Sequence, residues 1–368
     1  MSDKRWIIDA HLDLAWNALS WKRDITLPLV EMNQRDSERS DHPARGQATT
    51  SLPEMRLGGV AVCLATLMAR VPYAASRGFL ADSLDYPSHA AACAAAQGHL
   101  SYYRQLEQAG DVTLIRTASE LDAHWKKWEA ATEADLPQLP VGFIVAMEGC
   151  DAIVDPAQAE HWFGAGLRCT SLVHYGRSAY ATGTGEQGPL TPGGREMLQQ
   201  FSRLGMILDV THLCDESFFE AMEAFAGPIL ASHQNCRSLV PGDRQFSDEQ
   251  IRLVIERGGI LGAAADAWML DKNWRRSDAL LEPITVCLED IADHIDHVCQ
   301  LAGNCLHAAI GSDLDGGFGT EQTPRDLASI ADLQGISEIL RRRGYRESDV
   351  DAVFHGNWLR FFRQHLPE

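Results

Sequence analysis

Eight short apolar runs, rich in Val, Ile, Leu and Ala, recur along the chain and predict buried strands. Stretches with helical periodicity separate most of these runs. Strand, helix and strand repeated to eight predict a parallel sheet, and closure into a barrel removes its edges. The alternative is an open doubly wound sheet, but the glycine-rich turn G-x-G-x-x-G is missing after the first strand. The predicted strands are residues 6–10, 59–66, 141–147, 168–173, 206–211, 228–232, 259–264 and 308–312.

Helix signals stand between these strands. Thr191-Pro192 predicts an N-cap followed by proline at the first helical position, and Gly205 ends that helix. Ser247 opens a capping box for a helix that ends near Gly258. Asp215 is the predicted cap of a helix over 216–226. The other predicted helices are 88–109, ended by Gly110, and 285–302, 326–343 and 348–365.

We therefore predict a single α/β domain over residues 1–368, a somewhat distorted (β/α)8 TIM barrel with long loops at its C-terminal face. Residues 17–57 follow the first strand as a charged loop without clear periodicity, and residues 175–190 form a glycine-rich loop after the fourth strand. Both loops either line a site at that face or form mobile surface. Residues 111–139 form a small excursion with a minor strand at 112–115.

Composition narrows the partners and the compartment. The net charge of −19 argues against nucleic acid or an anionic membrane, because both would repel the chain. No apolar stretch is long enough to span a bilayer. Residues Met1 to Arg5 lead straight into the first strand, so we expect no secretory signal. The nine scattered cysteines include no C-x-x-C pair, which favours free thiols in a reducing cytoplasm.

Polar residues stand at the carboxyl ends of the predicted strands, where the active site of a TIM barrel lies. Such residues are costly to bury without partners, which suggests that they partner one another around metal. Imidazole and carboxylate groups suit zinc, and iron or manganese less clearly. Cysteines near these positions are more plausible as apolar filler than as ligands. The strand-end residues are His11, Asp13, Glu148, His212, His233 and Asp313.

One tetrahedral ion with an open position needs only three protein ligands. Five candidate ligands are more than such an ion can bind: His11, Asp13, Glu148, His212 and His233. They suit two ions bridged by a carboxylate, which lower the pKa of bound water to roughly 7 and supply a hydroxide nucleophile. A protein nucleophile is then not required, and no G-x-S-x-G motif occurs. His294 and His297 lie among aspartates on a predicted helix, and we interpret them as part of a solvated face.

Several stretches match the motifs of one known family, and chance agreement at so many ordered positions is negligible. The stretches are Asp9-Ala10-His11-Leu12-Asp13-Leu14, Met147-Glu148-Gly149, Thr50 to Val60, Leu190 to His212, Ala231 to Gly262, and Ile310 to Gly316. On these residues the chain resembles the membrane (renal) dipeptidase family, zinc metallopeptidases of the M19 type, along nearly its whole length.

The resemblance implies a distorted (β/α)8 barrel with two zinc ions per chain and assigns a role to each site residue. By match, His11, Asp13 and Glu148 would hold one ion, and Glu148, His212 and His233 the other. His174 matches a substrate-contacting histidine, Arg244 an arginine that meets the substrate carboxylate, and Asp313 the acid/base aspartate. These residue types suit those roles: a guanidinium holds a carboxylate, a histidine donor stabilises an oxyanion, and a carboxylate moves a proton.

The chain also departs from the family near the substrate. Tyr175-Gly176-Arg177 follows His174 where many members carry an Asn-bearing segment. The seventh strand ends in Ala263-Ala264-Ala265-Asp266-Ala267-Trp268, where the renal enzymes have an aromatic residue near the substrate carboxylate. These changes leave the metal ligands intact and put the identity of the substrate in doubt.

We therefore expect a cytoplasmic, binuclear zinc dipeptidase that hydrolyses the amide bond of small dipeptides by attack of metal-bound hydroxide. The family often forms dimers, so a homodimer is a possible state. One alternative is an amidohydrolase or lactonase, although that group usually opens with H-x-H and often bridges its metals with a carboxylated lysine. The other alternative is an inactive binding protein on the same scaffold, which the intact ligand positions disfavour.

Overall fold

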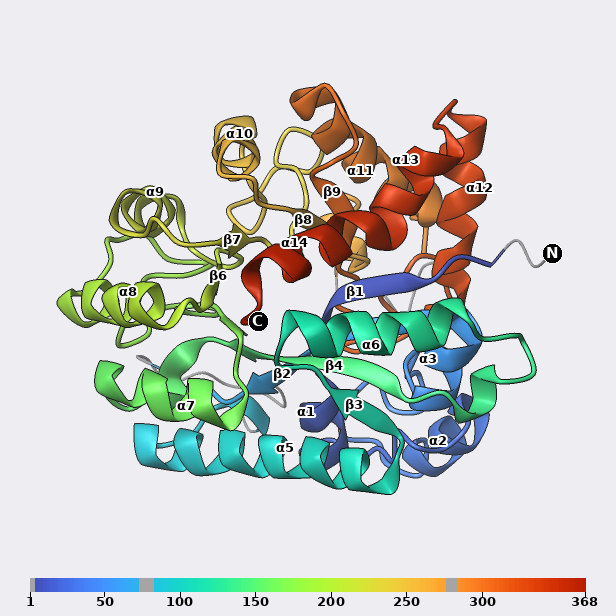
Figure 1. The fold of residues 1–368 in the computed structure, drawn as a ribbon, viewed down its shortest axis with the longest axis horizontal. Coiled ribbons are helices and arrows are strands. Elements are labelled where there is room, and N and C mark those ends of the chain that lie inside the picture. Colours follow the sequence, from blue (N-terminus) through green and yellow to red (C-terminus); the bar gives the residue numbers. More distant parts are fainter. Residues whose placement is uncertain (1–3, 73–82, 276–283) are drawn as a thin grey trace.

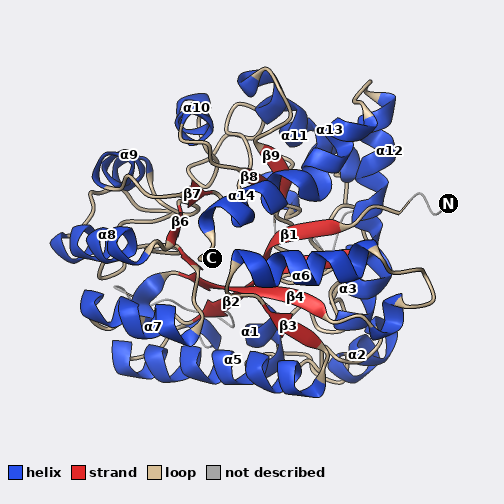
Figure 2. Cartoon of the chain, in the orientation of Figure 1, coloured by secondary structure: helices blue, strands red, loops and turns tan. Residues whose placement is uncertain are grey.

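The computed structural model describes residues 4–72, 83–275 and 284–368. Residues 1–3, which belong to the segment where we expect no secretory signal, lie outside the described ranges. A curved parallel sheet with helices around it forms the body of the protein (Figures 1 and 2). Seven strands make one sheet in the order β1-β2-β4-β5-β6-β7, with β3 beside β4, while β8 and β9 pair separately. The strands are β1 Ile7–Leu12, β2 Val60–Met68, β3 Val112–Leu114, β4 Val141–Glu148, β5 Cys169–Thr170, β6 Ile207–Asp209, β7 Ile229–Leu230, β8 Leu261–Ala263 and β9 Ala308–Ile310.

Hydrogen bonds at two places connect the two sheets and close the strands into a ring. At the first, the amide of Gly262 donates to the carbonyl of Ala231 over 2.9 Å and links β7 to β8. At the second, the amide and hydroxyl of Ser312 donate to the carboxylate of Asp9 over 2.9 and 2.5 Å, so a side chain connects β9 to β1. All eight predicted strands are present, and the predicted distorted barrel is confirmed. The predicted minor strand is β3.

The axis of the ring is filled with small and medium apolar side chains. Side chains from all eight strands of the ring can contact one another only near its axis. One buried cluster contains a residue from each of these strands or from the position next to it. Its members include Ile8, Leu64, Ile144, Cys169, Ile207, Leu230, Ile260 and Ala309, together with Trp358 and Phe362 of the C-terminal helix. Gly262 and Gly311 permit close approach of the last strands, because a Cβ at either would meet the carbonyl of Ser232 at 2.1 or 1.7 Å.

Most predicted helices are present with the expected ends. Ser88 and Gly110 bound the long alanine-rich helix, Thr191 caps the helix that begins at Pro192, and Ser247 forms the predicted capping box. The helices are α1 Leu14–Leu19, α2 Leu29–Asp36, α3 Leu52–Gly58, α5 His89–Ala109, α6 Ala118–Glu129, α7 Ala159–Ala165, α8 Pro192–Leu204, α9 Asp215–Ala224, α10 Asp248–Glu256, α11 Leu288–Ala302, α12 Gly335–Arg342, α13 Glu347–Asp351 and α14 Asn357–His365. No helix among the described residues has both the length and the apolar character needed to cross a membrane.

The prediction of a loop over residues 17–57 was wrong. The segment contains α2 and α3, and buried ion pairs hold its charged residues in place. Arg23 Nε lies 3.0 Å from Asp36 Oδ2, and Arg45 NH1 lies 2.8 Å from Asp36 Oδ1. Both arginines pack over the ring of Trp21, with guanidinium carbons 4.4 and 5.0 Å from its centroid. Charges that resembled a solvated loop in the sequence therefore organise a folded segment.

Two smaller predictions were also wrong. Asp215 is the first residue of α9 rather than its cap, and its carboxylate binds the guanidinium of Arg237 at 2.7 and 2.8 Å. His294 is buried, and its Nδ1 accepts a hydrogen bond from the amide of Cys236 at 3.0 Å. Burial lowers the pKa of His294 to about 3, so the side chain is a neutral core residue. Its neighbour His297 lies nearer the surface, 2.8 Å from Asp248.

Candidate active site

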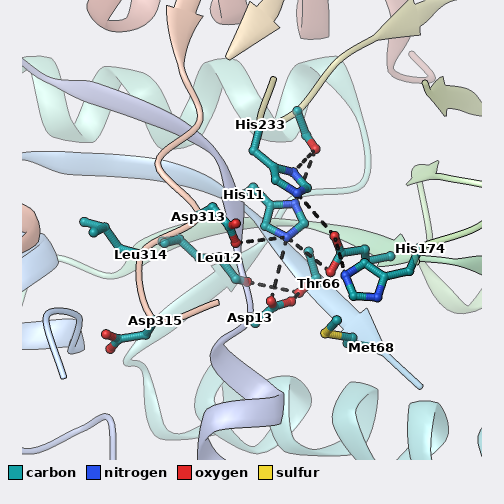
Figure 3. Close-up of polar contacts among 12 residues, drawn as sticks. His11, Leu12, Asp13, Thr66, Met68, His174, His233, Asp313, Leu314 and Asp315 are labelled. Carbon is teal, nitrogen blue, oxygen red and sulfur yellow. Dashed lines mark hydrogen bonds and ion pairs between the residues drawn. The ribbon is translucent and has the colours of Figure 1, made fainter. Parts of the chain in front are cut away.

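The strand-end residues gather in one cluster at the carboxyl ends of the strands. His11, the last residue but one of β1, lies at the centre of this cluster (Figure 3). Its Nε2 lies 3.5 Å from Glu148 Oε2, 3.8 Å from Asp13 Oδ2 and 3.9 Å from Asp313 Oδ1. Asp315, two residues beyond Asp313, points away from the cluster and accepts hydrogen bonds from the 49–50 backbone. The structure therefore brings together residues that are as far apart in sequence as 11 and 313.

Glu148 stands between two sets of possible ligands. Its Oε2 faces His11, while its Oε1 lies 3.1 Å from His212 Nε2 and 3.3 Å from His233 Nε2. Two groups of ligand atoms within 4.8 Å of one another are therefore His11, Asp13, Glu148 and Glu148, His212, His233. These groups coincide with the two triads that the family resemblance implies. Asp313 forms a third such group with His11 and His233, so its position is also within ligand range.

Hydrogen bonds on the far side of each ring determine which nitrogen faces the cluster. Ser232 Oγ donates to Asp209 Oδ2 at 2.5 Å, so it accepts from His233 Nδ1 at 2.8 Å and His11 Nδ1 at 3.3 Å. The hydroxyl of Thr184 lies 3.0 Å from His212 Nδ1 and also reaches the His212 carbonyl. With hydrogens on Nδ1, His212 and His233 direct the lone pairs of Nε2 into the cluster, and the neutral form of His11 does the same.

The donor set fits metal ions. His212 Nε2 and His233 Nε2 face each other at 3.2 Å as two acceptors, and His11 Nε2 has no hydrogen-bond partner among the described residues. Lone pairs that converge on one another and on carboxylates are unfavourable unless a cation lies between them. Two ions that share Glu148 would give these nitrogens and oxygens a partner.

The protonation states of the cluster also favour bound metal ions. Burial lowers the pKa of His212 and His233 well below the usual histidine value, so both rings stay neutral at neutral pH. Burial raises the pKa of Asp313 well above its usual range, and the charges of Glu148 and Asp13 raise it further. Burial opposes protonation of His11, yet the carboxylates of Glu148 and Asp13 raise its pKa well above the usual value. The cluster therefore concentrates negative charge that metal cations would balance.

Sequence reasoning missed the residues that orient the ligands. Asp209 and Ser232 hold two histidines, Thr184 holds a third, and Thr66 Oγ1 donates to Asp13 Oδ1. In the sequence they are single polar positions in or beside apolar runs, and their partners belong to neighbouring strands or loops. Backbone strain also marks the site, because His212 has a positive φ of 69° and Asp313 one of 58°.

A cavity of about 560 Å³ opens above the cluster. His174 lines it, with Nδ1 3.4 Å from NH1 of Arg70. Because a guanidinium can only donate, the hydrogen of the neutral imidazole is on Nε2, which lies 3.8 Å from Glu148 Oε1. Burial, with the charges of Arg70 and Arg244, lowers the pKa of His174 well below its usual value. His174 is therefore a neutral donor that faces the cluster.

Arg244 is another basic residue that lines the cavity. It is buried, and it donates to Gln234 Oε1 and to the carbonyl of His233, both at 2.8 Å. Within the described ranges, no carboxylate lies within 4.0 Å of its guanidinium. A buried cation held by neutral groups favours an anionic ligand. Tyr175, from the 175–190 loop, also lines the cavity, with its ring 4.7 Å from that of His174 and 5.1 Å from that of His212.

The fold and the site together define a TIM-like barrel with a candidate two-metal centre beneath a substrate-sized cavity. Residues 1–366 match the model of the membrane dipeptidase family, peptidase family M19. The chain therefore belongs to this family, and the resemblance seen in the sequence is confirmed.

Two relatives are each similar to about half of this chain. A Klebsiella pneumoniae protein described as uncharacterized, from the pqqA 5′ region, is 31% identical over 183 residues, or 49% of this chain and 63% of that protein. Dipeptidase 3 of Rattus norvegicus is 29% identical over 175 residues, which cover 48% of this chain and 33% of the rat protein. The chain thus matches between about one third and two thirds of these relatives' lengths.

A solved structure with the same fold is a metallo peptidase from Rhodobacter sphaeroides, liganded with a phosphinate mimic of the dipeptide L-Ala-D-Ala. It covers 99% of both chains with a TM-score of 0.76 and 23% identity. A dipeptidase described as a metallo peptidase of family M19 has a TM-score of 0.77 and 23% identity, and covers 99% of this chain and all of the other. At this level of identity, both likenesses show the fold.

Proposed function

We propose that this protein is a binuclear zinc dipeptidase that hydrolyses the amide bond of small dipeptides. One observation carries the proposal: Glu148 shares its two carboxylate oxygens between two triads of ligand atoms at the floor of the cavity. Family membership supports it, as does the dipeptide mimic in the Rhodobacter structure. When bound, the two ions would polarise the scissile carbonyl and lower the pKa of a water molecule to roughly 7.

Three side chains of this protein would act on the substrate. His174 would donate from Nε2–H to the carbonyl oxygen as negative charge develops there. Arg244 would hold the terminal carboxylate, because it is buried among neutral partners. Burial and nearby carboxylates raise the pKa of Asp313. Its carboxylate would accept a proton from the attacking water and pass that proton to the leaving amine.

The two alternatives make different predictions. An amidohydrolase or lactonase would turn over other small carboxylates in preference to dipeptides, and an inactive binding protein would turn over neither. We also propose a cytoplasmic location, with which nine free cysteines are consistent, and a possible homodimer.

The test combines metal content with turnover. Protein purified without chelator should contain about two zinc equivalents and hydrolyse members of a dipeptide library. A single tight ion, with no second binding event on titration, would defeat the two-metal assignment. Two bound ions without hydrolysis of any dipeptide would refute the proposed activity.

A further inference from the structure

The hydrogen bond to the ring of His174 differs in kind from those to the proposed metal ligands. Nδ1 of His233 lies 2.8 Å from the hydroxyl of Ser232, which accepts its hydrogen. Nδ1 of His174 instead lies 3.4 Å from NH1 of Arg70, a guanidinium that can only donate. The two rings therefore carry opposite tautomers. His233 presents a lone pair on Nε2, whereas His174 presents an N–H group.

Aromatic neighbours fix the plane of the His174 ring but not its tautomer. The ring centroid lies 4.7 Å from that of Tyr175 and 4.4 Å from that of His212. These contacts act equally on both tautomers. Arg70 acts on only one, because a hydrogen on Nδ1 would point at the N–H groups of the guanidinium. Within residues 4–72, 83–275 and 284–368, Arg70 is the only hydrogen-bond partner of this ring, whose Nε2 faces Glu148 Oε1 at 3.8 Å (Figure 3).

Arg70 is itself held in place from two directions. Its Nε donates to Asp85 Oδ1 at 2.5 Å, and the two side chains are only 15% and 11% exposed. On the backbone, the amide of Arg70 donates to the carbonyl of Leu84 at 3.0 Å, and the amide of Tyr86 donates to the carbonyl of Arg70 at 2.8 Å. Because the guanidinium is planar, the bond from Nε to Asp85 also determines where NH1 points.

We propose that Arg70 is a positioning residue, which holds His174 in the tautomer that donates from Nε2 and thereby keeps this ring from binding metal. The proposal rests on the proposed function, in which Nε2–H of His174 stabilises the negative charge on the carbonyl oxygen. Arg70 also lines the cavity, so a direct contact with the substrate is the competing explanation. A residue that acts through His174 should lose its effect when the imidazole is removed, whereas a direct contact should keep it.

A double-mutant comparison separates the two explanations. In the zinc-loaded protein, Arg70→Met should lower kcat for a hydrolysed dipeptide by about 10- to 10²-fold with KM within about threefold of wild type, because a misplaced donor loses transition-state stabilisation. His174→Ala should lower kcat by about 10²- to 10³-fold, the usual cost of an oxyanion donor. In that background, Arg70→Met should change kcat by less than about threefold. A full loss there would overturn the positioning role.

The tautomer provides a readout that does not depend on turnover. Nitrogen NMR of isotope-labelled histidine rings in the zinc-loaded protein shows which ring nitrogen carries the hydrogen, and the His174 signal is the one missing from His174→Ala. We expect the hydrogen on Nε2 in the wild type. In Arg70→Met it should divide between the two nitrogens or move to Nδ1. A wild-type ring with its hydrogen on Nδ1, or an unchanged signal in Arg70→Met, would overturn the assignment to Arg70.

Arg56→Met is the matched control. Arg56 is an arginine with a side chain only 10% exposed, and its NH2 lies 3.2 Å from Asp111 Oδ1, but it does not line the cavity. Its replacement should leave kcat and the His174 signal as in the wild type. Since Arg70→Met leaves the Asp85 carboxylate without its partner, the double variant Arg70→Met/Asp85→Asn removes both charges and should show the same change of tautomer. Should neither variant fold, the wild-type tautomer decides: Nε2–H supports the proposal and Nδ1–H overturns it.

Failure of this inference is distinguishable from failure of the proposed function. If dipeptides are hydrolysed but Arg70→Met lowers kcat equally with and without His174, only the inference is wrong. If no dipeptide is hydrolysed with both metals bound, the proposed function itself is wrong. The NMR measurement still shows in that case whether Arg70 sets the tautomer of His174.

Discussion

Replacement of Ser232 by alanine should weaken zinc binding at both of the proposed metal sites. The hydroxyl of Ser232 accepts from His11 of one triad and from His233 of the other, and it donates to Asp209. In Ser232→Ala, two ring N–H groups lose their acceptor and a buried carboxylate loses a donor. A hydrogen-bond partner of a metal-bound histidine typically contributes 10- to 100-fold in metal affinity. Because one hydroxyl serves one histidine in each triad, we expect a loss of about that size at each site.

Thr184 provides the comparison that makes this prediction specific. Among the described residues, the hydroxyl of Thr184 hydrogen-bonds with His212 alone, which belongs to the second triad. Thr184→Val keeps the shape of the side chain and should weaken one zinc site by about 10- to 100-fold while the other changes little. Ser337→Ala removes a buried hydroxyl on α12, where Ser337 Oγ donates to the carbonyl of Gln334. This control should leave both zinc constants unchanged.

Competition with a chromophoric zinc chelator would measure the two binding constants, and near-UV circular dichroism would verify that each variant is folded. The predicted pattern is two weakened sites for Ser232→Ala, one for Thr184→Val and none for Ser337→Ala. If Ser232→Ala binds both ions as the wild type does, or loses affinity at only one site, the shared hydroxyl does not orient both triads.

Three further predictions concern activity and pH. Asp313→Asn should lower kcat by about 10²-fold or more with zinc content unchanged, whereas loss of zinc would make Asp313 a ligand. Arg244→Met should lower kcat/KM by about 10- to 10³-fold, and dipeptide amides cleaved as well as free dipeptides would assign Arg244 another role. Burial lowers the pKa of His124 to about 4, so the stability from its neutral form is complete above the unfolded pKa of about 6.5 and declines as pH falls toward 4. Between pH 7.5 and 5, urea unfolding should show the wild type losing about 2 kcal/mol more than His124→Gln, and equal losses would exclude this source of acid sensitivity.

The sequence was sufficient to predict the strands and the polar residues that follow them. A buried parallel strand is a short apolar run, and a histidine or carboxylate at its end interrupts that run in a recognisable way, as at His11 and Glu148. Which residues of different strands contact one another cannot be predicted from the sequence around each strand. Asp9 of β1 binds Ser312, which follows β9, and Asp209 of β6 binds Ser232, which follows the neighbouring strand β7. Both contacts therefore depend on how the strands pair around the barrel.

The errors have a similar physical origin. The charges in residues 17–57 looked solvated because the sequence does not reveal that Asp36 meets two arginines in a buried network. His294 shares its helix with several acids, yet its face of α11 packs against Cys236. In both cases tertiary partners changed the environment of a polar residue, and local composition does not predict such partners.

The division of the barrel into two sheets has a consequence for evolution. The five proposed metal ligands lie on strands of the seven-stranded sheet or within three residues of their ends, whereas Asp266 and Asp313 follow the separate pair β8 and β9. Because Asp266, Trp268 and Met269 line the cavity, we expect mutations in residues 263–270 to alter the substrate range while the proposed ligand triads stay intact. Related barrels should diverge fastest in this pair and retain the same metal chemistry. Random mutagenesis confined to residues 263–270 is accordingly a direct route to variants with new specificities.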